Sequence, residues 1–404
     1  MKQLLLQARG RPDLSAAARL SIATRLLLTS AFLMNVGQFM ILPFLAVYLT
    51  TTLHYPAWQV GTLLSANILC TRALPLAAGM IGDRLSHSTT ILTGILVRSL
   101  GFLGLALFQS FPFLLGATLL MGTGGALYNP SIHSVFAAQP AEQHKRIFST
   151  LNQVLNLGAV LGPLLGSLLL LFGPQLPFFG GSGLFFLIAL TLFFFRQQYR
   201  TSATRTQLVD SFRQVLGHKH FMLFTLFMVL FWILFTQLTV AFPLEAFRIS
   251  HNDFYVSAVY WVNGGTGFVL MAIVLKKVFQ RYNPMYLVSI GMLCTGLGFA
   301  LIQFFHTGFW LLCCVGIYTL GETLVLPGSD MVVADISTSS QENAGAFFGM
   351  FSLSWALGGA IGNYLGTALI ESGDPAWSWT LYGLIGLVGC ILTLWQARWR
   401  HKRA

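Results

Sequence analysis

Apolar residues along this chain form repeated blocks of about 20 residues separated by short polar segments. A helix of that length crosses roughly 30 Å of hydrocarbon. The block GLFFLIALTLFFF at 183–195 shows no alternation of apolar and polar positions, so the short strands of a membrane β-barrel are not predicted. The pattern predicts twelve membrane-spanning helices, over residues 26–50, 58–81, 89–109, 112–137, 147–172, 177–196, 221–244, 254–275, 284–305, 309–334, 344–370 and 377–397.

The composition excludes an ordinary soluble protein. Only 9% of the residues are charged and 55% are hydrophobic, whereas about 25% are charged in a typical soluble domain. All five cysteines lie in apolar blocks without a metal-type spacing to histidines, so we predict free thiols and no metal site. The apolar run near the N-terminus is too short for a cleaved signal peptide.

The basic residues predict the orientation in the membrane. The net charge is +11, and with an even number of spans the side that holds both termini would carry 20 of the 23 Lys and Arg residues. Positive residues accumulate in cytoplasmic loops, so we predict that both termini are cytoplasmic. Glu245 and Arg248 fall in a predicted loop on the opposite side. No basic stretch is interleaved with exposed aromatic residues, so nucleic-acid binding is not predicted.

A basic connection after the sixth span divides the chain into two halves. We predict an N-terminal six-helix bundle over residues 1–195, a cytoplasmic linker over 196–220 and a C-terminal six-helix bundle over 221–404. The short loops on the non-cytoplasmic side favour a multi-pass protein of a cell inner membrane.

The two halves share an internal repeat with an offset of 200 residues. The segment LNLGAVLGPLLGSLLL (155–170) matches WALGGAIGNYLGTALI (355–370). Glycines at four-residue spacing share one helix face and allow a neighbouring backbone to approach closely. The aligned pairs are Gly158 with Gly358, Gly162 with Gly362, and Gly166 with Gly366.

Twelve spans, a basic central connection and this repeat resemble the major facilitator superfamily of secondary transporters, whose two six-helix halves enclose a midplane cavity. The segment GMIGDR (79–84) resembles the start of the family's cytoplasmic-loop signature, although LSHS follows where the family has a glycine and two basic residues. The segment GAVLGPLLG (158–166) resembles the span-five motif of antiporters. In LLMGTGGALYNP (119–130), the fourth-span motif lacks its usual arginine, because Thr118 stands there. The resemblance implies conformational gating by Gly79, Asp83, Arg84, Gly158, Gly162, Pro163 and Gly166.

Two acidic residues lie in the tenth predicted span. The segment YTLGETLVLP (318–327) resembles the corresponding span of drug:proton antiporters, where a membrane glutamate is a candidate for proton coupling. A charge near the membrane centre costs at least ~2.5–3.5 kcal/mol, so Glu322 is expected to face water, have a partner or be protonated. We predict proton coupling by Glu322 and Asp330. A neutral acid hydrogen-bonded between helices remains the alternative for Glu322, and Asp330 also suits a cytoplasmic gate.

Polar and aromatic residues within the spans are candidates for lining a substrate cavity. Arg72 is expected to hold a carboxylate of another span, to attract an anionic substrate, or to extend toward the headgroups. Helix–helix hydrogen bonding or packing is the alternative for the other candidates. The predicted cavity residues are Asn35, Gln38, Arg72, Asn129, Trp232, Gln237, Tyr260, Asn263 and Trp355.

The resemblance implies proton-coupled export of small amphipathic molecules or drugs by alternating access. The alternative is an uptake symporter or uniporter for a small metabolite, with Arg72 binding an anionic group. An enzyme is not predicted, because the sequence has no clustered metal-ligand motif, phosphate-binding loop or nucleophile elbow. The expected partners are a small-molecule substrate, protons and the lipid bilayer, without a cofactor, and we expect the protein to act as a monomer.

Overall fold

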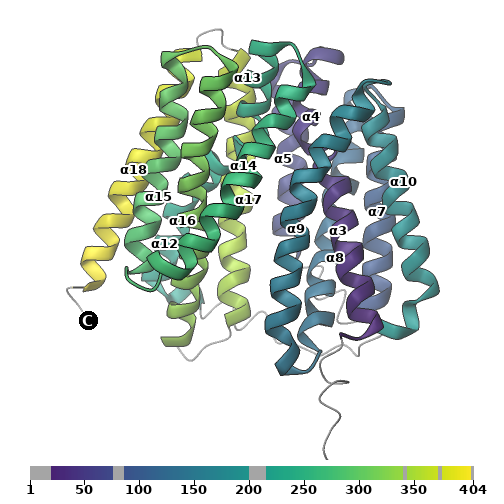
Figure 1. Ribbon diagram of the computed structural model, residues 1–404, viewed down its shortest axis with the longest axis horizontal. Coiled ribbons are helices and arrows are strands. Elements are labelled where there is room, and N and C mark those ends of the chain that lie inside the picture. Colours follow the sequence, from purple (N-terminus) through teal and green to yellow (C-terminus); the bar gives the residue numbers. More distant parts are fainter. Residues whose placement is uncertain (1–19, 76–85, 200–214, 340–343, 372–374, 402–404) are drawn as a thin grey trace, which may run out of the picture.

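The structure is a computed structural model that describes residues 20–75, 86–199, 215–339, 344–371 and 375–401. Within these residues every regular element is a helix, as Figure 1 shows. The first half contains α3 (Ile22–Phe39), α4 (Leu42–Val47), η2 (Tyr48–Thr52), α5 (Ala57–Ala73), α7 (His87–Leu107), α8 (Phe111–Ala137), α9 (Ala141–Leu170), α10 (Leu176–Phe194) and η3 (Arg196–Tyr199). The second half contains α12 (Lys219–Thr236), α13 (Ala241–Ser250), α14 (Asp253–Ile273), η4 (Val274–Val278), α15 (Pro284–Ala300), η5 (Leu301–Phe304), α16 (Gly308–Ser339), α17 (Ala344–Glu371) and α18 (Pro375–His401).

When the contiguous short helices are joined, these elements form twelve long segments that correspond to the twelve predicted spans. In the described part of the chain, nine of the segments are both long and apolar enough to cross a membrane. The other three are α5, α14 and α17. These three helices pack between the two halves, α5 against α17 and α14 against α9.

The first segment of each half is broken at the same place in the repeat. Pro43 lies in the first turn of α4 and Pro243 lies near the start of α13, exactly one repeat offset apart in the chain. Proline has no N–H to continue a helix, but it is tolerated in the first turn of a new one. The breaks therefore separate α3 from α4 and α12 from α13.

Glu245 and Arg248, which the sequence predicts in a loop between two spans, lie in a helix instead. Both lie in α13, which extends the seventh segment to Ser250. The Glu245 side chain is 1% exposed and accepts two hydrogen bonds from Arg248, from Nε and Nη2, each 2.8 Å long. Because the two side chains are three residues apart, they share a helix face and neutralise each other. The predicted span ends at residue 244, before the charged residues, whereas the paired charges of Glu245 and Arg248 lie within a helix that continues to Ser250.

The two halves stand side by side in Figure 1, with α3 to α10 on the right and α12 to α18 on the left. The short helices α4 and α13 contact each other at the end of the molecule opposite the chain's C-terminus. Phe44 of α4 is 2% exposed and belongs to one apolar cluster with Leu238 and with Phe242 of α13. This packing closes one end of the interface between the halves.

The repeated glycines let the fifth and eleventh segments press against the first and seventh. A Cβ atom at Gly162 of α9 would lie 2.6 Å from Phe39 Cβ and 2.8 Å from the Val36 carbonyl oxygen. A Cβ atom at Gly362 of α17 would lie 2.8 Å from the Ile233 carbonyl oxygen in α12. Both distances to backbone are too short for any side chain, so the glycines make the same close helix contact in each half.

Candidate functional site

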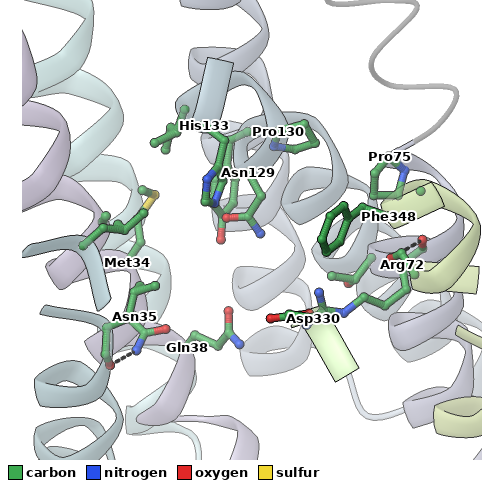
Figure 2. Close-up of a pocket in the computed structure, with 18 residues that line it drawn as sticks. Met34, Asn35, Gln38, Arg72, Pro75, Asn129, Pro130, His133, Asp330 and Phe348 are labelled. Atoms are coloured by element: carbon green, nitrogen blue, oxygen red, sulfur yellow. Dashed lines mark hydrogen bonds between the residues drawn. The ribbon is translucent and has the colours of Figure 1, made fainter. Parts of the chain in front are cut away.

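A cavity of about 780 Å³ lies between the two halves. Its walls come from α3, α5, α8 and α9 on one side and from α16 and α17 on the other. Figure 2 shows polar side chains that point into it from several of these helices. The polar and charged residues of the lining are Asn35, Gln38, Thr71, Arg72, Tyr128, Asn129, His133, Asp330 and Ser352. Four of the predicted cavity residues are thus brought together: Asn35, Gln38, Arg72 and Asn129.

On α3, Asn35 and Gln38 differ in the hydrogen bonds that they make. The Asn35 amide nitrogen donates to the Leu155 carbonyl oxygen of α9. This contact ties α3 to α9 beside Gly158, where an added Cβ would lie 2.9 Å from Asn35 Cβ. The Gln38 side chain instead accepts a hydrogen bond through Oε1, from Arg98 of α7.

Arg98 is a functional candidate that sequence reasoning alone did not identify. It lies in the middle of α7 and is 3% exposed. Its Nη2 donates to Gln38 Oε1 at 2.9 Å and its Nη1 donates to the Tyr128 hydroxyl at 3.1 Å. Among the described residues, no carboxylate lies within 4.0 Å of this guanidinium, and its Nε is buried without a partner. The sequence could have pointed to Arg98 because it is a single charge in the middle of a predicted span, and such a charge requires polar neighbours.

The fourth-span glycines make room for this arginine. A Cβ atom at Gly125 would lie 2.5 Å from Arg98 Nη1, and one at Gly124 would lie 2.6 Å from the Arg98 backbone nitrogen. The glycine run of α8 therefore forms the space that Arg98 occupies. Thr118 in the same helix is fully buried, and its hydroxyl donates to the Leu115 carbonyl oxygen.

Arg72 reaches across the interface between the halves. Its guanidinium carbon lies 3.1 Å from the centre of the Trp355 ring in α17, a cation–π contact. Trp355 in turn stacks on Trp232 of α12, with ring centroids 4.2 Å apart and an interplanar angle of 5°. Ser352 Oγ donates to the Arg72 carbonyl oxygen at 3.4 Å. Trp355 thus packs against Arg72, and Trp232 packs against Trp355. Neither tryptophan lines the cavity.

The two carboxylates of α16 lie in different surroundings. Asp330 is exposed, lines the cavity and makes no hydrogen bond or ion pair within the described residues. Glu322 is half-buried and does not line the cavity. Its Oε2 accepts a hydrogen bond of 2.6 Å from Asn263 Nδ2 in α14, and the same nitrogen donates to Thr319 Oγ1 at 3.1 Å. In the described part of the chain, no basic group is within 4.0 Å of Glu322.

Two further predicted cavity residues, Gln237 and Tyr260, join helices elsewhere. Gln237 is completely buried; its Nε2 donates to the Gly362 carbonyl oxygen at 2.9 Å, and its Oε1 accepts from the Tyr382 hydroxyl at 3.2 Å. The Tyr260 hydroxyl donates to the Leu238 carbonyl oxygen at 2.9 Å, next to the closed end. Both side chains lie outside the cavity.

Hydroxyl groups join the halves along the whole length of α5 and α17. Thr367 Oγ1 donates to the Ala57 carbonyl oxygen at 3.0 Å, and Ser65 Oγ donates to the Ala360 carbonyl oxygen at 2.7 Å. At the other helix pair, Ser257 Oγ of α14 donates to the carbonyl oxygen of Pro163 in α9 at 2.9 Å. Pro163 therefore contacts the opposite half.

The remaining predicted gating residues lie in a helix contact or outside the described residues. Gly166 faces the Met40 carbonyl oxygen and the Phe44 ring, so it belongs to the contact of α9 with α4. Gly79, Asp83 and Arg84 lie outside the described residues. In the part of the chain that the structure describes, no group of three or more His, Cys, Asp or Glu side chains is placed to hold a metal ion.

Comparisons with known proteins agree with this architecture. Residues 27–341 match the family model described as Major Facilitator Superfamily. The chain is 28% identical over 380 residues to "Multidrug resistance protein MdtH" of Photorhabdus laumondii, covering 91% of this chain and 92% of that protein. It is 26% identical over 386 residues to the protein of the same name from Salmonella typhimurium, covering 93% and 94% of the two chains.

Solved structures with the same fold are also transporters. The POT family transporter PepTSo superposes with a TM-score of 0.83 at 15% identity, over 96% of this chain and 99% of that one. The nucleoside transporter NupG superposes with a TM-score of 0.79 at 14% identity, over 92% and 99%. The predicted all-α polytopic fold is confirmed, and the family match covers more than half of the chain. The chain belongs to the Major Facilitator Superfamily and is a membrane transporter, not an enzyme.

Proposed function

We propose that this protein exports small amphipathic molecules and that proton entry drives the export. The observation that carries this proposal is the pair of carboxylates on α16. Glu322 is held between two helices by one amide donor without a basic partner, and Asp330 faces the cavity. A carboxylate in such a place binds or releases a proton when its surroundings change, which is what a coupling site requires.

The two carboxylates have separate roles in this proposal. They are eight residues apart on α16 with Pro327 between them, which corresponds to about 12 Å along a helix. Glu322 is the coupling site, because its contact with Asn263 of α14 changes when the two helices move. Asp330 is the gate-side group, since it shares the cavity with Arg72 of the opposite half. Approach of these two side chains would close the cavity.

The shape of the interface supports alternating access. The halves are packed together at α4 and α13, and the cavity lies toward the other end. We infer from the distribution of basic residues that both termini are cytoplasmic, and in that orientation the cavity lies on the cytoplasmic side. The equivalent close contacts of the two glycine ladders allow each half to move as a packed unit.

The nature of the cavity supports a drug-sized substrate. Ligand cavities typically measure about 300–1,000 Å³, and this one measures about 780 Å³ with mixed polar and apolar walls. The relatives named as multidrug resistance proteins support export of foreign amphipathic compounds. We propose that the transporting unit is a monomer.

Transport by purified protein in vesicles tests the proposal. An imposed proton gradient should drive a fluorescent amphipathic dye against its own gradient, in the direction opposite to the protons. Glu322→Gln should abolish this uphill movement and leave downhill movement of the dye intact, because the variant keeps the hydrogen-bonding shape but cannot release a proton. Glu142→Gln, the same change at an exposed position in the first turn of α9, is the matched control and should transport normally.

Two outcomes would contradict the proposal. Uphill transport by Glu322→Gln at the control rate would remove the coupling role of Glu322. Movement of the dye in the same direction as the protons would instead support the uptake alternative. Asp330→Asn should slow both uphill and downhill movement, since a gate acts on every turnover.

A further inference from the structure

The hydrogen bonds around Arg98 determine which atoms of its neighbours face the cavity. A guanidinium has five N–H donors and no acceptor. The Gln38 atom within 2.9 Å of Nη2 is therefore the carbonyl oxygen, and the amide nitrogen of Gln38 is directed elsewhere. The Tyr128 oxygen likewise accepts from Nη1, so the hydroxyl hydrogen remains available to another acceptor. Both residues line the cavity.

The wall of the first half consequently presents hydrogen-bond donors. Among the described residues, the Gln38 amide nitrogen donates to no acceptor, and the Tyr128 hydroxyl accepts from Arg98 but donates to no acceptor. Arg72, also donor-only, lies in the same wall. Figure 2 shows Gln38 in the floor of the cavity, between Asn35 on one side and Asp330 and Arg72 on the other.

The charge in this wall is not neutralised from within it. Arg98 has no carboxylate within 4.0 Å in the described residues, and neither has Arg72, whose Nε is buried without a partner. Among the described residues, the one carboxylate in the lining is Asp330, which belongs to the opposite half. A buried cation is stable only when hydrogen-bonded or paired with an anion. Within the described residues this wall holds two cations and no carboxylate, so a bound molecule can supply the anionic group.

We propose that this donor wall, formed by Gln38, Tyr128 and Arg72 and oriented by Arg98, is a subsite for the carboxylate or a comparable anionic group of an amphipathic substrate. The inference rests on the proposed export function and names the substrate class for the same cavity. Gln38, Tyr128 and Arg72 touch the anionic group. Arg98 is a positioning residue, because it acts by fixing the orientation of Gln38 and Tyr128.

The substitution Gln38→Glu tests the subsite at its most specific point. The new carboxylate keeps the size of the side chain and can still accept from Arg98, but it replaces the donor in the cavity with an acceptor. It also places a negative charge beside Arg98, which has no carboxylate partner among the described residues, so we expect the variant to fold. The matched control is Gln303→Glu, the same chemical change at a residue outside the cavity. Gln303 Oε1 accepts from the Thr380 hydroxyl, and its Nε2 donates to the Ala300 carbonyl oxygen of the same turn.

The probes are a rhodamine with a free carboxylate and the methyl ester of the same dye. Their affinities are measured at equilibrium by fluorescence anisotropy, with purified full-length protein in uncharged detergent micelles and no proton gradient. Wild type and Gln303→Glu should bind the acid more tightly than the ester. Gln38→Glu should lower the ratio of acid to ester affinity by about tenfold to a hundredfold, the effect of losing a hydrogen bond to a charged group.

Arg98 is tested through the same ratio. Arg98→Gln should lower the preference for the acid, because an amide can present either a donor or an acceptor to Gln38. Arg98→Lys should restore part of it, since an ammonium group is also donor-only. A purely structural role would lower the affinities for both dyes together and leave their ratio unchanged. Elution of each variant as a single species in size-exclusion chromatography shows that it is folded.

Equal affinity of wild type for both dyes, or an unchanged ratio in Gln38→Glu, would overturn the proposal. The measurement also separates this proposal from the proposed function. Selective binding of the acid without proton-driven transport in vesicles would refute the coupling and leave the subsite standing. Proton-driven transport without selectivity would do the reverse.

Discussion

The contact between α9 and α3 allows a quantitative prediction. Gly162 faces the backbone of α3, and we consider its replacement by alanine. The added Cβ would lie 2.6 Å from Phe39 Cβ, 2.8 Å from the Val36 carbonyl oxygen and 2.9 Å from the Met40 nitrogen. Ordinary contact begins at 3.4 Å, so these distances are short by 0.5 to 0.8 Å. Two of the three atoms belong to the backbone, so no side-chain rotation relieves the overlap and the helices have to separate.

The expected change in stability combines two terms of opposite sign. Alanine is favoured over glycine inside a helix by about 0.8–1.0 kcal/mol. Inserting a methyl group into a close-packed contact costs about 1–3 kcal/mol. The matched control is Gly183→Ala in α10, where the added Cβ would meet no atom within 4 Å. Because both variants gain the same helix preference, the difference between them isolates the packing cost.

Thermal unfolding in detergent provides the assay, followed with a dye that reacts with cysteine thiols as they become exposed. The free cysteines Cys314 and Cys390 are buried in the folded protein and suit this readout. A change of 1 kcal/mol shifts the midpoint by about 2–4 °C in a unit of about 150–250 residues, the size of one half. Gly183→Ala should therefore unfold at or slightly above the wild-type temperature, and Gly162→Ala about 2–12 °C below Gly183→Ala. Equal midpoints for the two variants would refute the reasoning that backbone contact requires glycine at this position.

Two further substitutions address buried polar contacts. Gln237→Leu should lower the unfolding free energy by about 1–3 kcal/mol, because it leaves the Tyr382 hydroxyl and the Gly362 carbonyl without their partner; an unchanged midpoint would show that water replaces the amide. Arg248→Ala should destabilise by about 1.5–3 kcal/mol, since Glu245 is 1% exposed and loses both of its charged hydrogen bonds. The double variant Arg248→Ala with Glu245→Gln should recover part of that loss, and failure to recover would mean that the charge of Glu245 is not the cause.

Part of the site could be predicted from the sequence because a polar side chain in hydrocarbon needs either water or a partner. That rule selected Asn35, Gln38, Arg72 and Asn129, which the structure brings together in one cavity. The same rule selected Gln237, and Tyr260 was selected as an aromatic wall residue, but the polar groups of both are satisfied by neighbouring helices. It does not distinguish the two outcomes, because the direction of a side chain within a bundle depends on which helix lies next to it.

The sequence by itself determined the class of protein, the twelve segments and the repeat that relates the halves. These follow from the thickness of the membrane and from the spacing of apolar residues and glycines, which are properties of the chain alone. Only the tertiary structure decided that Arg98 holds Gln38 and Tyr128, and that Glu322 meets Asn263. Those contacts join residues up to 60 positions apart in the chain. Their partners are chosen by helix packing, since a buried polar group binds whichever complementary atom the neighbouring helix places within reach.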